Sequence, residues 1–246
     1  MRKMYHGITI ALILPARNEG LALPSVLKDV PPEIDSVLVV DNGSTDTTAS
    51  VAKAHGAVVV SESVPGYGMA CLAGIAHLKK HPPDIVAFAD ADGSDDLTKL
   101  RELITPIAKE EADFVIEKRM PVEPQALSQQ QRFGNWLAAS LIRLFWGHSF
   151  GDLGPMRAIR WKSLSALGMT DQNFGWTVEM QILALKNGLR IQEYPLPYRK
   201  RTAGRSKISR TLRGSLKAGM KILWVIFREV FVDKKLRRDK RPTKVT

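Results

Sequence analysis

The sequence predicts an α/β fold with a mostly parallel sheet flanked by helices, and two observations lead to it. The first half of the chain repeats one pattern, in which a short run rich in Val, Ile and Leu is followed by a turn and a helical stretch. Continuous apolar runs are typical of strands that helices cover on both faces. The alternation of such strands with helices favours a parallel sheet. The 246 residues, 44% of them hydrophobic, can bury a substantial core, which excludes a mini-protein held together by disulfides or metal.

The elements follow from these runs in chain order. The expected strands of the first half are 8–14, 36–40, 57–60, 85–89 and 114–116. The helices expected between them are 21–30, 47–55, 68–80 and 97–109. The second half is less regular, with helices expected at 129–146, 177–186 and 209–232 and strands at 155–159 and 190–195. No internal repeat or low-complexity linker divides the chain, so we expect one domain with a C-terminal helical appendage.

The cysteine count and the hydrophobic segments indicate a cytoplasmic protein. A single cysteine, Cys71, excludes an intrachain disulfide and fits a reducing compartment. The basic N-terminus runs directly into the first strand without a small-residue cleavage site, so we expect no secretory signal. Charged residues interrupt every apolar stretch before it reaches the 18 to 20 residues, approximately, that a membrane-spanning helix needs. These interruptions are Arg132, Arg143, Lys217, Lys221 and Arg228.

Positive charge is concentrated at the C-terminal end. Residues 199–246 hold 17 Lys and Arg against three acidic residues, a local net charge of +14, whereas residues 1–198 carry −3. Such a segment attracts phosphates, either those of nucleic acid or those of anionic lipid headgroups. A nucleic-acid-binding protein is the remote alternative, because we recognise no nucleic-acid module in the chain.

The expected helix 209–232 favours the lipid surface. An apolar stripe lies beside a cationic stripe, an arrangement typical of a helix in a membrane interface. The alternative is that the apolar stripe packs on the core of the protein. The apolar stripe is Leu212, Leu216, Met220, Leu223, Phe227 and Val230, and the cationic stripe is Arg210, Arg213, Lys217, Lys221 and Arg228. We expect the cationic stripe to face anionic headgroups, so that reversing its charges would spare folding.

Polar residues follow three of the expected strands, at 15–19, 41–46 and 90–92. In an open α/β sheet these ends face one crevice, where nucleotides bind. Asp90 and Asp92 point to the same side of an extended chain and can jointly hold Mg²⁺ or Mn²⁺. Such a cation bridges diphosphate oxygens and neutralises charge on a leaving group. The first strand lacks a following G-x-G-x-x-G turn, which disfavours a nicotinamide-dependent dehydrogenase.

Four segments, I-L-P-A-R-N-E, V-L-V-V-D-N-G-S-T-D-T-T, G-Y-G-M-A-C-L-A-G-I and A-F-A-D-A-D-G-S-D-D, together resemble the family-2 glycosyltransferases. Within that family, which has the GT-A fold, the chain is similar to the polyprenyl-phosphate or dolichyl-phosphate mannosyl- and glucosyltransferases. The resemblance covers residues 8–230. It implies transfer of a hexose, with inversion, from a UDP- or GDP-hexose to a polyprenyl phosphate, with Mg²⁺ or Mn²⁺ as cofactor. The enzyme would act in the cytoplasm, peripherally associated with an anionic membrane surface.

The resemblance also implies site residues. Those near the nucleoside would be Pro15, Ala16, Arg17, Glu19 and Asp41, and those at the sugar nucleotide and metal would be Asp90, Ala91 and Asp92. Phosphates would be held by Arg119 and Arg132, and by Arg201 and Lys207 of a basic loop. Asp152 and Glu179 would line the acceptor side. The residues expected to carry catalysis are Asp92, Arg119, Arg132 and Glu179.

The nature of the acceptor decides whether a base is needed. An acceptor phosphate, with a second pKa of about 6, is ionised near neutral pH and attacks without a strong base. If the acceptor were instead a hydroxyl of a lipid or small molecule, Glu179 or Asp152 would have to take the proton, although Glu179 is equally a charge of a first helical turn.

We expect a catalytic domain at 1–208, an interface helix at 209–233 and a disordered basic tail at 234–246.

Overall fold

The computed structural model describes residue 5, residues 7–202 and the backbone of residues 212–239, with side chains of that last helix at 218–232. Its centre is a seven-stranded sheet in the order β3-β2-β1-β4-β6-β5-β7. The strands are β1 (Ile10–Ala16), β2 (Ser36–Asp41), β3 (Val58–Ser61), β4 (Ile85–Phe88), β5 (Phe114–Pro121), β6 (Arg157–Arg160) and β7 (Ile191–Tyr198). Only β6 runs antiparallel to its neighbours, so the predicted mostly parallel sheet is confirmed.

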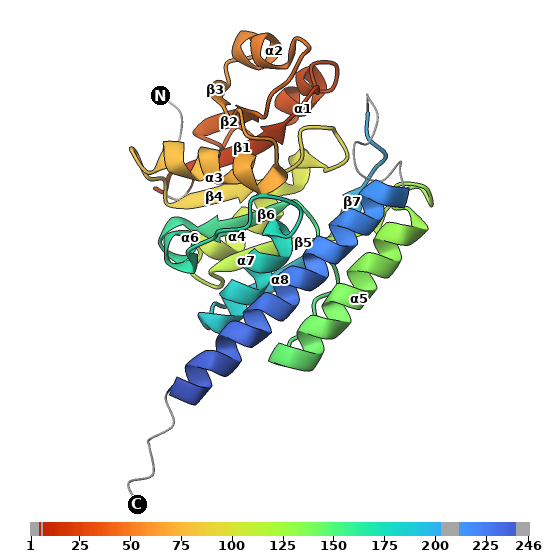
Figure 1. Ribbon diagram of the computed structural model, residues 1–246. Coiled ribbons are helices and arrows are strands. Elements are labelled where there is room, and N and C mark those ends of the chain that lie inside the picture. The colour runs from red at the N-terminus through yellow and green to blue at the C-terminus, as the bar shows by residue number, and fades with distance from the viewer. Residues whose placement is uncertain (1–4, 6, 203–211, 240–246) are drawn as a thin grey trace, which may run out of the picture.

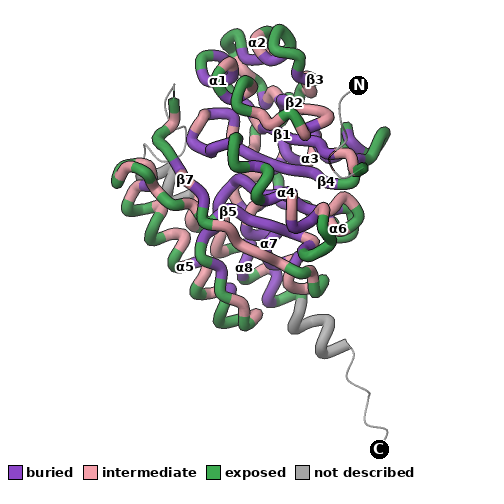
Figure 2. The backbone as a smooth tube through the Cα atoms, turned by 180° about the vertical axis from the view of Figure 1, so that it is seen from behind, coloured by how far each residue is buried: buried purple, intermediate pink, exposed green. Residues whose placement is uncertain are grey.

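Helices cover both faces of the sheet (Figure 1). One layer contains α1 (Leu23–Lys28), α2 (Thr48–Ala54) and α4 (Leu100–Ala108), which follows the 3-10 turn η1 (Leu97–Lys99). The other layer contains α3 (Tyr67–Leu78), α5 (Gln129–Trp146), α6 (Trp161–Leu167), α7 (Trp176–Lys186) and α8 (Leu212–Asp239). Alternate residues of β1 and β4 point to opposite faces, so each strand contributes to both cores. β1 and β4 are therefore almost wholly buried, as their purple colour in Figure 2 shows.

Helix α5 begins and ends at strong local signals. Ser128 and Gln131 form a reciprocal capping box at its N-terminus. Gly147 follows its last residue with φ +75°, a left-handed conformation that glycine adopts without strain. Ala138 and Ile142 turn inward, whereas Phe133, Trp136 and Leu144 are exposed. The helix thus presents a partly apolar outer side.

Helix α8 lies beside α5 and packs on α7 (Figure 1). Its inner side is formed by Val225, Ile226 and Val230 and by two cations, Lys221 and Arg228, which pair with acidic residues of the protein. The expectation that these two cations face outward, and that their reversal would spare folding, is therefore wrong. The remaining cations of the predicted stripe lie outside the described side chains.

Some exposed residues of α8 are apolar. Met220, Trp224, Phe227 and Phe231 recur at helical spacing and are 54%, 52%, 43% and 67% exposed. The ring of Phe227 contacts that of Phe145 in α5, with 6.2 Å between centroids. One apolar strip of the helix is thus turned outward beside the outer side of α5, while Val225, Ile226 and Val230 pack inward.

Three elements differ from expectation. β5 continues to Pro121 because it pairs with β7 along its whole length. The short helix α6 was not predicted, and α8 includes residues 234–239 of the expected disordered tail. No helix in the described part of the chain is sufficiently long and apolar to span a bilayer, as expected.

Candidate active site

The loops after β1 and β2 lie side by side because their strands pair in register, with Ala16 opposite Asp41. Asn18 joins them: its backbone N–H donates to Ser44 Oγ at 2.9 Å, and its side-chain oxygen accepts from Thr45 N at 2.7 Å. Pro15, Ala16, Arg17 and Glu19, which we expect near a nucleoside, therefore lie at the end of β1 beside Asp41. Arg17 is exposed, whereas Ala16 and Glu19 are buried.

Asn42 is a positioning residue that our sequence interpretation missed. Its side-chain nitrogen donates to Glu62 O and Val64 O at 3.1 and 2.7 Å, and its side-chain oxygen accepts from Gly66 N at 2.8 Å. It thereby fixes the segment that leads into α3. A Cβ at Gly66 would lie 2.2 Å from Gln172 O, so this close approach requires glycine.

The loop after β4 contains Asp90, Ala91 and Asp92, and the loop is anchored by its own hydrogen bonds. Asp95 Oδ2 accepts from Asp90 N at 2.8 Å, and Asp92 Oδ1 accepts from Ser94 N at 2.9 Å and from Ser94 Oγ at 2.5 Å. Burial and the charge of Asp92 raise the pKa of Asp90, and the positive charges of Arg119 and Arg201 partly offset this rise. The resulting pKa of Asp90 is about 7.

The chemistry of this pair fits a divalent cation. Carboxylate oxygens are the ligands that Mg²⁺ and Mn²⁺ prefer, and a cation would relieve the repulsion between Asp90 and Asp92. Among the described residues, no three acidic, histidine or cysteine side chains converge on one point.

Arg119 and Asp152 form a buried ion pair next to the aspartate loop. Arg119 Nε lies 2.6 Å from Asp152 Oδ2, and Nη2 lies 2.9 Å from Oδ1. Asn135 of α5 also donates to Asp152. Arg119 further stacks over the ring of Tyr198, at 5.1 Å from its centroid. This bidentate pairing fixes the guanidinium plane of Arg119.

A groove of about 410 Å³ continues from this pair along α5. Its polar wall contains Arg119, Arg132 and Arg143 against one acidic residue, Asp152. Its lining residues are Arg119, Pro121, Leu127, Arg132, Asn135, Trp136, Ala139, Ser140, Arg143, Ser149, Phe150, Gly151 and Asp152. Of the predicted site residues, the structure thus brings together Arg119, Arg132 and Asp152, with Arg143 and Asn135 beside them.

Arg201 reaches the aspartate loop from the segment after β7. Its Nη2 donates to Asp92 Oδ2 at 2.7 Å and its Nη1 donates to Glu19 Oε1 at 3.2 Å. It therefore joins the nucleoside side of the crevice to the expected metal site. Lys207, predicted in the same basic loop, lies outside the described residues.

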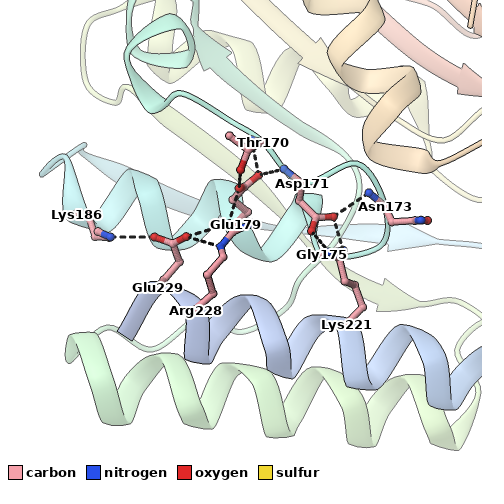
Figure 3. A network of polar contacts seen from close by, with 9 residues as sticks. All are labelled: Thr170, Asp171, Asn173, Gly175, Glu179, Lys186, Lys221, Arg228 and Glu229. Carbon is pink, nitrogen blue, oxygen red and sulfur yellow. Dashed lines mark hydrogen bonds and ion pairs between the residues drawn. The ribbon is translucent and has the colours of Figure 1, made fainter. Parts of the chain in front are cut away.

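Glu179 belongs to a different cluster, between α7 and α8 (Figure 3). Its carboxylate accepts from Thr170 N, Thr170 Oγ1 and Asp171 N at 2.7 to 3.0 Å, and from Arg228 Nη2 at 2.6 Å. Lys221 pairs with the buried Asp171 at 2.8 Å in the same cluster. No hydrogen bond described in the structure joins Glu179 to the aspartate loop or to Arg119. Its contacts are those of a structural carboxylate.

Two further buried acids lie behind the site. In the described part of the chain, three of their side-chain oxygens have no hydrogen-bond partner: both oxygens of Glu117 and Oδ1 of Asp95. Burial, together with the charge of Asp95, raises the pKa of Glu117 well above its ordinary range, and burial and Asp90 do the same for the pKa of Asp95. The only sequence signal for Glu117 is an acid inside a strand, two residues before Arg119.

Comparison with known proteins identifies the family. The family model for glycosyl transferase family 2 matches residues 11–168. An uncharacterised glycosyltransferase of Mycobacterium tuberculosis is 40% identical over 210 residues, which cover 85% of this chain and 94% of that protein. A dolichyl-phosphate hexose transferase of Haloferax volcanii is 30% identical over 226 residues, 89% of this chain and 95% of that protein.

A solved structure extends the likeness to three dimensions. Glucosyl-3-phosphoglycerate synthase from Mycobacterium tuberculosis, crystallised with Mn²⁺, UDP and glucosyl-3-phosphoglycerate, matches with a TM-score of 0.72 and 25% identity. The match covers 90% of this chain and 80% of that one. The predicted GT-A fold is thereby confirmed. With the sheet, the strand-end loops and the family match in agreement, the chain belongs to glycosyl transferase family 2.

Proposed function

We propose that the protein transfers a hexose, with inversion, from a nucleoside diphosphate sugar to a polyprenyl phosphate at an anionic membrane surface. The observation that carries the proposal is the arginine-lined groove that leads from the ion pair of Arg119 and Asp152 along α5. One relative acts, by its name, as a dolichyl-phosphate hexose transferase. The structural relative was crystallised with Mn²⁺ and UDP, which supports a UDP-sugar and a divalent cation here.

The donor would lie across the three strand ends. Asp41 is available to the nucleoside because, among the described residues, only its Oδ1 accepts a side-chain hydrogen bond, from Ser44 N at 3.0 Å, which closes a turn. Asp90 and Asp92 would hold the cation, whose charge stabilises the diphosphate leaving group. Arg201, already at Asp92, lies within reach of the same diphosphate.

The acceptor phosphate would lie at Arg119 and Arg132. A guanidinium remains charged and binds phosphate oxygens bidentately. Asp152 holds Arg119 in one orientation, so the phosphate meets a preorganised donor rather than a mobile side chain. A phosphate acceptor is ionised near neutral pH and requires no strong base.

A hydroxyl acceptor is supported less well. It would need Glu179 or Asp152 as a base. Glu179 is engaged by Thr170, Asp171 and Arg228, and Asp152 is engaged by Arg119 and Asn135. Neither carboxylate is available to a hydroxyl without losing these contacts.

Exposed apolar residues on α5 and α8 support the membrane location. Monomeric soluble proteins rarely expose large contiguous apolar patches. On these two helices, nine large hydrophobic residues are at least 39% exposed. They are Phe133, Trp136, Leu144, Phe145, Met220, Trp224, Phe227, Phe231 and Val232. The groove lies along the same helix α5, so an acceptor whose chain is in the bilayer would enter it from that side. The cationic C-terminal sequence would add attraction to anionic headgroups, with about 1 kcal/mol for each Lys or Arg near the surface.

The test is a product assay with a matched set of acceptors. The protein is incubated with UDP- and GDP-hexoses, Mn²⁺ or Mg²⁺, and one acceptor: a polyprenyl phosphate in anionic liposomes, 3-phosphoglycerate, or the dephosphorylated polyprenol. We expect a hexosylated polyprenyl phosphate by mass spectrometry, and loss of at least about a hundredfold in rate for Arg132→Gln. A product with 3-phosphoglycerate alone would contradict the proposal that the acceptor is a polyprenyl phosphate. A product with the polyprenol would show that the acceptor is a hydroxyl.

A further inference from the structure

The segment after β7 lies along the aspartate loop and is held there by its backbone. Arg199 N donates to Ser94 O at 2.9 Å, and both Thr202 N and Thr202 Oγ1 donate to Asp92 O at 3.0 Å. A Cβ at Gly93, where φ is +78°, would lie 2.3 Å from Thr202 Oγ1. The two segments are therefore fixed in register, with the side chain of Arg201 directed at Asp92.

Arg201 contacts the Asp92 oxygen that a cation would use. Asp92 Oδ1 already accepts two hydrogen bonds from Ser94, which fill its two lone pairs. Asp92 Oδ2 is the oxygen left for a metal ion, and it accepts from Arg201 Nη2 at 2.7 Å. The side chain of Arg201 is 23% exposed and also reaches Glu19 at 3.2 Å. A guanidinium and a divalent cation disfavour each other against Oδ2, because two positive charges would then lie side by side on one oxygen.

A diphosphate resolves this competition. Its negative charges attract both the cation and the guanidinium, and its oxygens offer Arg201 a bidentate partner in exchange for Asp92. We propose that Arg201 and the divalent cation exchange on Asp92 Oδ2, so that the cation binds tightly only together with the nucleoside diphosphate. The inference rests on the proposed function for the identity of the donor and the cation. Beyond contributing positive charge to the diphosphate site, Arg201 thereby makes the binding of the cation depend on the binding of the nucleoside diphosphate.

The exchange makes a distinctive prediction for variants of Arg201. Arg201→Gln removes the competing charge, so Mn²⁺ alone should bind at least about tenfold more tightly than to the unmodified protein. The same variant loses a diphosphate contact, so the gain in Mn²⁺ affinity on adding UDP or GDP should shrink by at least about tenfold. A residue that only binds the diphosphate would change the second quantity and leave the first unaltered.

Arg199 provides the matched control. It belongs to the same segment and pairs with Asp96 at 3.1 Å instead of Asp92. Arg199→Gln therefore removes one positive charge from the segment without freeing the metal-binding carboxylate. We expect its Mn²⁺ affinity, with and without nucleotide, to stay within about twofold of that of the unmodified protein.

The experiment measures free Mn²⁺ by electron paramagnetic resonance during titration of the full chain, with no nucleotide, with UDP and with GDP. Circular dichroism checks that each variant is folded, and Arg201→Lys, which keeps the charge, should retain the weak binding of Mn²⁺ alone. Tighter binding of Mn²⁺ alone to Arg201→Gln, and not to Arg199→Gln, is the expected result. Unchanged or weaker binding to Arg201→Gln, while nucleotide still promotes Mn²⁺ binding to the unmodified protein, would overturn the exchange alone. If neither nucleotide promotes Mn²⁺ binding to the unmodified protein, the proposed donor chemistry is overturned as well.

Discussion

Arg228 attaches helix α8 to the body of the protein through Glu179, and Arg228→Gln tests how much that contact stabilises the fold. Removing one partner of a buried ion pair costs about 3 to 5 kcal/mol, because a buried charge is left without its counter-ion. Glu179 is 1% exposed, but Arg228 is 24% exposed, and Glu179 keeps its hydrogen bonds from Thr170 and Asp171. We therefore expect a loss of about 2 to 3 kcal/mol in the free energy of unfolding.

The assay is urea denaturation followed by tryptophan fluorescence. Trp224 reports on this helix directly, because Lys221 and Arg228 lie over its ring at 4.3 and 5.1 Å from the centroid. Arg143→Gln is the control, since Arg143 is exposed on the neighbouring helix α5, and it should change the free energy of unfolding by less than about 0.5 kcal/mol.

The double variant Arg228→Gln with Glu179→Gln separates the ion pair from general damage to the helix. When Arg228 and Glu179 both lose their charge, no carboxylate of this contact is left without a cation, because Glu229, which also pairs with Arg228, keeps its ion pair with Lys186. The double variant should therefore be more stable than Arg228→Gln by about 1 kcal/mol or more. If Arg228→Gln unfolds at the same urea concentration as Arg143→Gln, the ion pair does not hold α8 and the reasoning fails.

Four other outcomes test the site and the surface. Asp92→Asn should lower turnover at least about a hundredfold with little change in unfolding midpoint, and a chelator should mimic it; full activity in the chelator would contradict a metal role. Asp41→Ala should weaken nucleotide binding in calorimetry far more than it changes thermal stability, and an unaltered titration would mean that the residue only closes a turn. Because the pKa of Asp90 is raised to about 7 in the folded protein, the metal-free protein should lose stability relative to Asp90→Asn as pH rises from about 4 to 7, with a constant difference of about 4 kcal/mol above that; parallel stability curves would refute the shift. Trp224→Ser with Phe231→Ser should reduce flotation with anionic liposomes at least about tenfold, from the apolar area lost, and undiminished flotation would place the membrane contact elsewhere.

The sheet was predictable from the sequence because its signals are local. Apolar runs such as those of β1, β2 and β4 are bounded by their own turn residues, and the polar strand ends follow from that alignment. The second half of β5 carries no such signal, because Glu117 to Pro121 is largely polar and becomes strand only by pairing with β7, more than 70 residues later. Helix α6 has only seven residues, too few for its periodicity to distinguish it from a loop.

The candidate site was predictable as a set of residue types but not as a set of contacts. Arg119 and Asp152 could each be singled out, but their bidentate pairing depends on β5 and the loop before β6 meeting across 33 residues. Arg201 could be assigned to a phosphate-binding loop, whereas its position on Asp92 requires the register between two distant segments. Such contacts depend on tertiary geometry that no local pattern encodes.

Helix α8 illustrates how an amphipathic pattern leaves orientation open. The pattern predicts one apolar and one cationic side, and a surface helix ordinarily buries the apolar side. Here Asp171 and Glu179 supply buried carboxylates opposite Lys221 and Arg228, so the cations find their strongest partners inside the protein. Part of the apolar side is then directed outward beside the outer side of α5, where it suits a partner that buries aromatic side chains rather than charged ones. A hydrocarbon interface is such a partner, and this is why the same ion pairs that stabilise the fold also support the membrane-bound acceptor that we propose.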